Sequence, residues 1–306
     1  MKTIEIQEIE GFKIGNAQDA KAKTGVTVIL CEAGASAGVD ISGGGPASRE
    51  TPLLSNFSAH NPLHAVVLSG GSAFGLAAAQ GVTQYLEERD IGYDTSYAKV
   101  PLVAQSSLYD LGTGSATVRP DAAMGYAACQ NAEKNQPQRG AVGAGTGATV
   151  GKIMGMARAS RSGLGLAALQ LGALKMGAVA AVNALGDIFD FETGEKLAGL
   201  MDENGGFASS EEALYALTEP KDLFTGNTTI ACLLTNAAFG RAQMNRLASM
   251  ARAGYARAIN PVATLADGDS IYAMSAGCVN ADLNVAGTLA ARVIAMAVRD
   301  AVLSVS

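Results

Sequence analysis

The chain has 306 residues, of which 48% are hydrophobic and 16% charged, so it can bury a large core in one or two domains. Its net charge of −6, with no basic run longer than a pair, argues against a nucleic-acid-binding protein, which needs clustered positive charge. No apolar run approaches the roughly 18 residues of a membrane span, and the acidic start lacks a signal peptide's apolar segment. We therefore expect a cytoplasmic protein without membrane or nucleic-acid partners.

The first third of the chain predicts two buried strands, at residues 24–30 and 64–68, because both runs are apolar and β-branched. Between them, SGGGPASRET (residues 42–51) predicts a loop, since it contains few apolar residues. The second strand runs into SGGSAFGL (residues 69–76), and an Ala-rich helix with apolar residues at helical spacing continues to about Glu88.

The middle of the chain begins with a glycine-dense loop, AVGAGTGATVG, at residues 141–151. Residues 164–182 are rich in Ala, Leu and Gly, and their pattern fits either buried strands or a helix. The more polar residues 192–226 indicate a surface segment or linker. After them, TTIACLLT (residues 228–235) returns abruptly to the pattern of a buried strand.

The last quarter predicts a helix with an apolar face over residues 244–251, a short strand at 270–274 and a closing helix from 285 to about 302. Strands therefore alternate with helices along the chain. This order predicts an α/β or α+β protein with layers of both kinds of element.

The chain has few candidates for a catalytic or metal-binding histidine, because it contains only His60 and His64. A zinc site of the HExxH type needs a glutamate directly after the first histidine, but Asn61 occupies that position and no third ligand is evident. We expect no metal site, one histidine in a surface loop and the other at the start of a strand.

Two glycine-rich segments come close to known catalytic patterns without matching them. Ser72 lies in GGSAFG between a predicted strand and a helix, but Phe74 stands where the nucleophile elbow GxSxG needs its second glycine. The glycines before Lys152 approach a phosphate-binding loop, but Ile153 replaces the Ser or Thr that would hold Mg²⁺. We expect no cofactor.

The junction between the polar segment and the strand that starts at Thr228 offers different chemistry. If the Asn227–Thr228 peptide bond breaks, Thr228 gains a free α-amine beside its own hydroxyl. Such an amine has a pKa of about 7.7 to 8.0 and can act as a general base near neutral pH. It would activate a weak nucleophile without a histidine. Any loop that enters a strand can contain this residue pair, so the junction by itself leaves a purely structural role open.

The junction belongs to a set of six segments that occur in this order: TGVTVIL, SGGGPASRET, SGGSAFGL, GAVGAGTGATVGK, NTTIACLLTNA and LADGDSIYAMSAG. Together they resemble the DmpA-type L-aminopeptidase/D-esterase family, which includes β-aminopeptidases and nylon-oligomer hydrolases, over about residues 11–276. The resemblance implies an α+β fold, a four-layer αββα sandwich, as a single domain over residues 1–306. It also implies self-cleavage into an α chain (1–227) and a β chain (228–306) that stay together, in a homotetramer or larger homo-oligomer.

The same resemblance assigns the reacting groups. Thr228 matches the nucleophile, and Asn227–Thr228 matches the bond that the nucleophile cleaves by attack on the Asn227 carbonyl. Asp267 and Asp269, in ADGDS, match acids that orient the nucleophile and balance the charge of its amine.

Three further residues match positions around the nucleophile in the family. Lys152 and Asn183 match residues that line the nucleophile, with Asn183 a candidate donor to the oxyanion. Tyr109, in SSLYDLG, matches a tyrosine near the oxyanion position. The segment SGGGPAS departs from the family, because many relatives carry Arg and Thr in a similar loop, and this leaves the substrate contacts open.

The expected function is hydrolysis of amide bonds in short peptides, amino-acid amides or oligomers with a free amino end. Asp267 or Asp269 could pair with the substrate ammonium. Two alternatives remain open: acyl transfer of the ornithine acetyltransferase type, and a catalytically silent binding protein of the same fold. Apart from copies of itself, the expected partners are the substrate and the protein's own cleaved chain.

Overall fold

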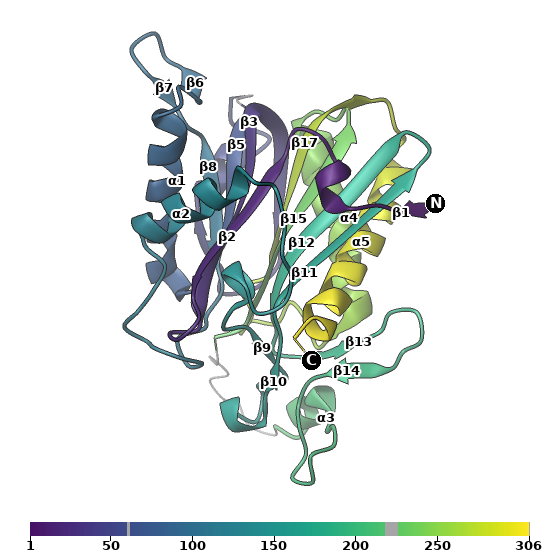
Figure 1. The fold of residues 1–306 in the computed structure, drawn as a ribbon. Helices are drawn as coiled ribbons and strands as arrows, with labels where there is room; N and C mark the ends of the chain where they lie inside the picture. The colour runs from purple at the N-terminus through teal and green to yellow at the C-terminus, as the bar shows by residue number, and fades with distance from the viewer. Residues whose placement is uncertain (60–61, 218–225, 306) are drawn as a thin grey trace.

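Two β-sheets packed face to face form the centre of the computed structural model, and two helices cover the outer face of each sheet (Figure 1). The structure describes residues 1–59, 62–217 and 226–305. This arrangement is the expected αββα sandwich. In spatial order the first sheet contains β1 (Lys2–Thr3), β11 (Leu164–Leu171), β12 (Leu174–Asn183), β15 (Thr228–Ala237) and β17 (Ser270–Val279).

The long strand β3 (Thr24–Ile41) joins the two sheets. Its last residues, 36–41, pair with β17 of the first sheet, and its first residues, 24–30, pair within the second. The register shifts between Leu30 and Ala35, where the strand leaves one sheet for the other. The other strands of the second sheet are β2 (Lys13–Asp19), β5 (Leu63–Ser69), β8 (Val103–Ser107) and β4 (Ala47–Arg49).

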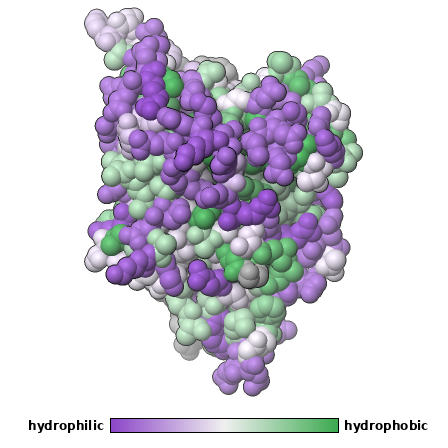
Figure 2. All heavy atoms as spheres, viewed as in Figure 1, coloured by the Kyte–Doolittle hydropathy of each residue, from purple (hydrophilic) through white to green (hydrophobic). Residues whose placement is uncertain are grey.

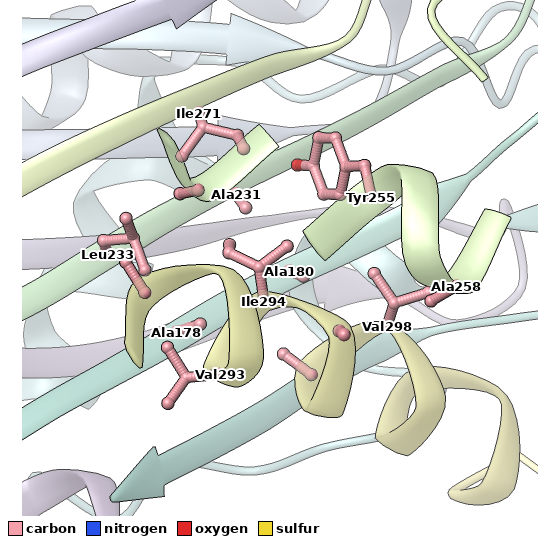
Figure 3. Close-up of a cluster of buried hydrophobic side chains, with 14 of the residues drawn as sticks. Ala178, Ala180, Ala231, Leu233, Tyr255, Ala258, Ile271, Val293, Ile294 and Val298 are labelled. Atoms are coloured by element: carbon pink, nitrogen blue, oxygen red, sulfur yellow. The ribbon is translucent and has the colours of Figure 1, made fainter. Parts of the chain in front are cut away.

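The alternation of side chains along the strands divides the core into three clusters. In β15, Ile230 and Cys232 point between the two sheets, whereas Ala231 and Leu233 pack against the outer helices. Figure 3 shows Ala231 and Leu233 beside Ile294 in the outer cluster. By the same alternation, the first residue of β15, Thr228, lies on the face between the sheets.

The helices were predicted well where an apolar face repeats over several turns. The helices α1 (Ala78–Glu87) and α2 (Ala122–Ala132) cover the second sheet, and α4 (Arg241–Ala258) and α5 (Leu283–Leu303) cover the first. Of these four, α2 was not predicted from the sequence, and α4 is longer than the predicted 244–251. The segment before α1 differs from the predicted continuous helix. It begins as a 3₁₀ helix, η3 (Ser72–Ala77), because the turn after β5 holds Gly71 and Ser72 at positive φ.

Several predicted loops contain short ordered elements, and one ambiguity is resolved. Residues 164–182 form the strands β11 and β12 of a hairpin rather than a helix. The polar residues 192–217 contain a strand and a helix of their own, while 218–225 lie outside the described residues. The remaining elements are β6 (Tyr93–Asp94), β7 (Lys99–Val100), β9 (Thr149–Val150), β10 (Ser160–Arg161), β13 (Asp187–Phe189), β14 (Lys196–Ala198), β16 (Ile259–Asn260), α3 (Ser210–Tyr215), η1 (Ile6–Glu8), η2 (Thr51–Leu54), η4 (Gly143–Gly145) and η5 (Met156–Arg158).

The surface is mixed in polarity. The face in Figure 2 is largely hydrophilic, with smaller apolar patches among the polar side chains. Among the described helices, none combines the length and the apolar character needed to cross a membrane. Even α5, with 21 residues, carries Arg292, Arg299 and Asp300.

Glycine allows the layers to approach closely at Gly165 of β11. A Cβ atom on this residue would lie 1.9 Å from the carbonyl oxygen of Ala297 in α5. We expect Gly165→Ala to lower the free energy of unfolding by about 1–3 kcal/mol, because the backbone of α5 must move to relieve the overlap. The control is Gly112→Ala, where the closest atom lies 3.8 Å away. Equal denaturant midpoints for the two variants would contradict this account of the layer packing.

Candidate active site

The residues assigned to the site converge because three strands of the first sheet have ends at the same edge. Asn183, the last residue of β12, pairs directly with Thr228, the first residue of β15. The strand β17 runs parallel to β15, with Ser270 opposite Ile230, so the residues just before β17 lie at this edge too. A single bridge continues the parallel pairing from Asn227 to Asp267.

The hydroxyl of Thr228 lies against the peptide bond that precedes it. Its Oγ1 donates a hydrogen bond to the carbonyl oxygen of Asn227. The same oxygen accepts a hydrogen bond of 2.9 Å from the backbone N–H of Gly268. Thr228 itself is 4% exposed, so the contact is largely shielded from water. The carbonyl is thus held by a backbone donor in the place where a negative charge would develop during attack.

Lys152 and Asn183 both bind the carbonyl oxygen of Gly226, the residue before Asn227. Asn183 Nδ2 donates to the carbonyl oxygens of Gly226, at 3.2 Å, and Tyr109, at 2.9 Å. Lys152 Nζ donates to Asn183 O at 2.8 Å and to Gly226 O at 3.4 Å. Gly226 has a φ of +67°, and a Cβ atom there would lie 2.2 Å from the ring of Tyr109. These contacts allow only glycine before Asn227.

The two acids, Asp267 and Asp269, position the backbone around Thr228. Asp269 accepts the N–H of Thr229 at 2.6 Å and that of Ala263 at 3.1 Å. Asp267 Oδ2 accepts from the N–H and the hydroxyl of Thr264 at 2.9 and 2.6 Å. Asp269 therefore fixes the start of β15 directly, and Asp267 fixes the turn that leads into β17.

Burial shifts the pKa values of these ionisable groups toward neutral pH. Lys152 is 1% exposed, and its loss of hydration lowers the pKa of the amine to about 7, although the carboxylates of Asp267, Asp269 and Asp110 oppose the shift. Burial raises the pKa of Asp269 to about 8, with a further contribution from the charge of Asp267, and burial also raises the pKa of Asp267. The site therefore contains an amine, on Lys152, and a carboxyl group, on Asp269, that can exchange protons near neutral pH.

Two residues of the site were missed by sequence reasoning. Gly268 supplies the N–H on the Asn227 carbonyl, and it lies between the two acids that were singled out. Asp110 follows Tyr109 directly, is 3% exposed, and accepts the N–H of Gly71 at 2.7 Å. A backbone N–H donor cannot be recognised from the sequence, because every residue except proline has one. A single buried acid such as Asp110 cannot be recognised either, because it belongs to no motif with a characteristic spacing.

The histidines and Ser72, which the sequence offered as other catalytic candidates, do not form a separate site among the described residues. His64 is buried in β5, where its Nδ1 accepts the N–H of Leu102 at 3.1 Å, and His60 lies outside the described residues. Ser72 borders the same cavity as Thr228, but its backbone takes a positive φ of 54° in the turn before η3. Within the described ranges, no group of three or more His, Cys, Asp or Glu side chains is arranged to hold a metal ion.

A small cavity of about 30 Å³ opens beside Thr228. A larger groove of about 630 Å³ lies on the outer face of α4 and α5. None of Lys152, Asn183, Thr228, Asp267 and Asp269 lines it. The small cavity is lined by Gly45, Ala47, Ser72, Ser107, Tyr109, Gly226, Asn227, Thr228 and Ala266.

A hydroxyl residue begins a central strand of the αββα sandwich and contacts the preceding carbonyl, an arrangement in which that hydroxyl could act as a nucleophile. The sequence model of peptidase family S58 matches residues 5–305, and the chain belongs to this family. It is therefore a hydrolase of the family that the ordered motifs indicated.

Relatives across the chain support this assignment. An uncharacterized aminopeptidase of Mycobacterium leprae is 36% identical over 294 residues, which cover 90% of this chain and 79% of the relative. A 6-aminohexanoate-oligomer endohydrolase of Kocuria sp. is 32% identical over 279 residues, covering 88% of this chain and 74% of that protein.

Solved structures show the same fold at lower sequence identity. The L-aminopeptidase D-Ala-esterase/amidase of Ochrobactrum anthropi, a variant of the Ntn hydrolase fold, aligns with a TM-score of 0.73 at 17% identity, over 99% of this chain and 86% of that one. A β-aminopeptidase of Burkholderia sp. aligns with a TM-score of 0.67 at 19% identity, over 97% and 85% of the two chains.

The raised pKa of Asp269 predicts how stability depends on pH. Between an unfolded pKa near 3.8 and a folded pKa of about 8, the folded protein binds the extra proton, so this residue lowers the free energy of unfolding as pH rises. Asp269→Asn lacks that dependence, and the variant should gain stability relative to its parent between pH 5 and pH 8. Urea midpoints of the parent and of Asp269→Asn, both carrying Thr228→Ala so that neither has the Thr228 hydroxyl, test this prediction. A difference that stays constant or shrinks at pH 8 would contradict the burial of an ionisable Asp269.

Proposed function

We propose that this protein cleaves its own Asn227–Thr228 bond and that the new amino-terminal Thr228 then hydrolyses amide bonds through an acyl-enzyme. The expected substrates are short peptides, amino-acid amides or oligomers with a free amino end. The observation that carries the proposal is the contact of the Thr228 hydroxyl with the Asn227 carbonyl, whose oxygen also accepts the Gly268 N–H.

Self-cleavage follows from this arrangement in three steps. The Thr228 oxygen attacks the Asn227 carbonyl carbon and gives its proton to a neighbouring base, while the Gly268 N–H stabilises the negative oxygen. The C–N bond then breaks as the Thr228 nitrogen takes up a proton, which leaves an ester between Asn227 and the Thr228 oxygen. Water hydrolyses this ester and releases the Asn227 carboxylate, together with the free hydroxyl and α-amine of Thr228.

Lys152 is the base that we assign to the first step. It is buried, it donates to the carbonyls of Gly226 and Asn183, and the lowered pKa of about 7 allows a neutral amine near neutral pH. Asp269 accepts the N–H of Thr229, so we assign it the role of positioning the start of β15 and not that of accepting the Thr228 hydroxyl proton.

Substrate hydrolysis reuses the same groups around the freed Thr228. The α-amine takes the hydroxyl proton, and a positive charge on Lys152 would keep the pKa of that amine low, because like charges disfavour its protonated form. Asn183 remains our candidate for a second oxyanion donor. Its Nδ2 contacts Gly226 O in the uncleaved chain, one residue before the reacting carbonyl.

The two alternative functions gain no support from the relatives, whose names describe aminopeptidases and an amide hydrolase of oligomers. Acyl transfer would use the same acyl-enzyme with an amine in place of water. A homotetramer or larger assembly and a cytoplasmic location remain predictions. Light scattering of the purified protein tests the assembly.

Replacement of the nucleophile tests self-cleavage directly. Purified wild-type protein should give two fragments on a denaturing gel, and the smaller fragment should begin with the sequence TTIACLL. Thr228→Ala should remain one chain and lose amide hydrolysis, because neither reaction has another oxygen in this position. Thr229→Ser is the neighbouring control and should still be cleaved. Full activity of an uncleaved wild-type chain would refute the mechanism.

The role of Lys152 predicts a pH dependence for self-cleavage. The rate should rise as pH increases through about 7, because the neutral fraction of the amine increases over that range. Lys152→Arg should slow cleavage by about 10²-fold or more and abolish this rise, since a guanidinium stays protonated. The control is Lys196→Arg, which alters a lysine paired with Asp187 outside the site. Wild-type pH dependence in Lys152→Arg would exclude the amine as the base.

A further inference from the structure

The turn between β5 and η3 contains a serine in a backbone conformation that suits glycine better. Ser72 has a positive φ of 54°, which is disfavoured for any residue with a Cβ atom. It is half-buried, and it lines the cavity beside Thr228. The strained residue therefore faces the candidate site, and strain of this kind is concentrated at functional sites.

The two residues before Ser72 are glycines because packing excludes a side chain there. A Cβ atom on Gly70 would lie 1.9 Å from Asp110 Oδ2. On Gly71, which also has a positive φ, a Cβ atom would lie 2.7 Å from Pro120 Cδ. Ser72 differs from both, because it combines a positive φ with a side chain.

Backbone hydrogen bonds hold this turn in place. The N–H of Ser72 donates to Leu108 O at 2.8 Å, and the N–H of Gly71 donates to Asp110 Oδ1 at 2.7 Å. The N-cap residue of η3 is Gly71, so the serine side chain does not cap that helix. The bonds of the turn use backbone N–H groups, which Ser72→Gly would keep. They therefore explain the conformation of Ser72 but not its side chain.

The cavity brings Ser72 close to the acyl side of the Asn227–Thr228 bond. Gly226 and Asn227, which form the acyl part of that bond in the uncleaved chain, line the same cavity of about 30 Å³. A space of this size holds about one water molecule, so the groups around it face one another at short range. An acyl residue that takes the place of Asn227 would therefore lie beside Ser72.

We propose that Ser72 is a further substrate-binding residue, whose hydroxyl forms a hydrogen bond with the acyl residue of the substrate. A serine hydroxyl both donates and accepts, so it suits the carbonyl, amide and amino groups that such a residue carries. A side chain that is unfavourable for folding and useful for binding is the trade-off expected at a functional site. The inference rests on the proposed amide hydrolysis and names a substrate contact of that same site.

Ser72→Gly tests the proposal, because stability and activity should respond differently. The urea midpoint should stay at or above that of the parent, since glycine relieves the positive φ. In the self-cleaved enzyme, kcat/KM for alanyl or β-alanyl p-nitroanilide, whichever the wild type hydrolyses faster, should fall by about fivefold or more through loss of one hydrogen bond. A lower midpoint, or an unchanged kcat/KM, would overturn the proposal.

Two matched variants separate the hydroxyl from the strain. Ser96 also has a positive φ, of 70°, and is exposed between β6 and β7, so Ser96→Gly should change the midpoint as Ser72→Gly does and leave kcat/KM unchanged. Ser72→Ala keeps the Cβ atom and removes only the hydroxyl. It should lose as much kcat/KM as Ser72→Gly without the benefit to stability. Wild-type kcat/KM in Ser72→Ala would rule out the hydroxyl as the binding group.

An ester with a minimal acyl group tests the side of the substrate that Ser72 contacts. The acyl group of p-nitrophenyl acetate has no polar group beyond the reacting carbonyl. The loss of kcat/KM in Ser72→Ala should therefore be at least about threefold smaller for this ester than for the p-nitroanilide. Equal losses for the two substrates would contradict a contact with the acyl residue.

Self-cleavage separates this inference from the proposed function. Two fragments from each Ser72 variant on a denaturing gel show that it has folded and has freed the amine of Thr228. A variant that stays one chain would place Ser72 in self-cleavage and overturn its role in substrate binding. Wild-type hydrolysis that the Ser72 variants leave unchanged refutes only the inference. A wild-type chain that neither cleaves itself nor hydrolyses either p-nitroanilide refutes the proposed function, and the substrate contact with it.

Discussion

The position of β15 between an antiparallel and a parallel neighbour is the constraint on which the site depends. The antiparallel pairing with β12 places the end of one strand beside the start of the other, and so joins Asn183 to Thr228. The parallel pairing with β17 brings two strand starts to the same edge, with Asp269 beside Thr229. Side-chain alternation then turns the Thr228 hydroxyl toward the space between the sheets. A slip of one residue would point this hydroxyl at the outer helices instead.

The site concentrates ionisable groups in a place where their burial opposes ionisation. Lys152, Asp267, Asp269 and Asp110 are each at most 3% exposed. The mutual attraction of the amine and the carboxylates does not cancel the loss of hydration, so their pKa values move toward one another. Such an arrangement costs stability, and groups with pKa values shifted in this way are common at catalytic sites. The rigid sheets and the backbone donors around these groups hold them together in spite of that cost.

Regular elements with a strong apolar pattern were predictable, and irregular ones were not. The strand at residues 228–235 was found because every residue there is buried, and it extends only to Ala237. The strand from Thr24 was predicted to end at residue 30, but it continues to Ile41. Beyond residue 30 small buried residues alternate with partly exposed ones, and residues 36–41 are held by pairing with β17, a contact distant in sequence. Residues 164–182 were ambiguous for a related reason, since short apolar runs fit both periods.

The sequence by itself determined the class of fold and the family, because ordered motifs and apolar patterns are local properties of the chain. It also indicated the residues that surround Thr228. Only the tertiary structure decided how these groups act on one another. The donor on the Asn227 carbonyl is the backbone of Gly268, and the pKa of Lys152 depends on its burial. Each of these properties arises from atoms that are distant in sequence and adjacent only after folding.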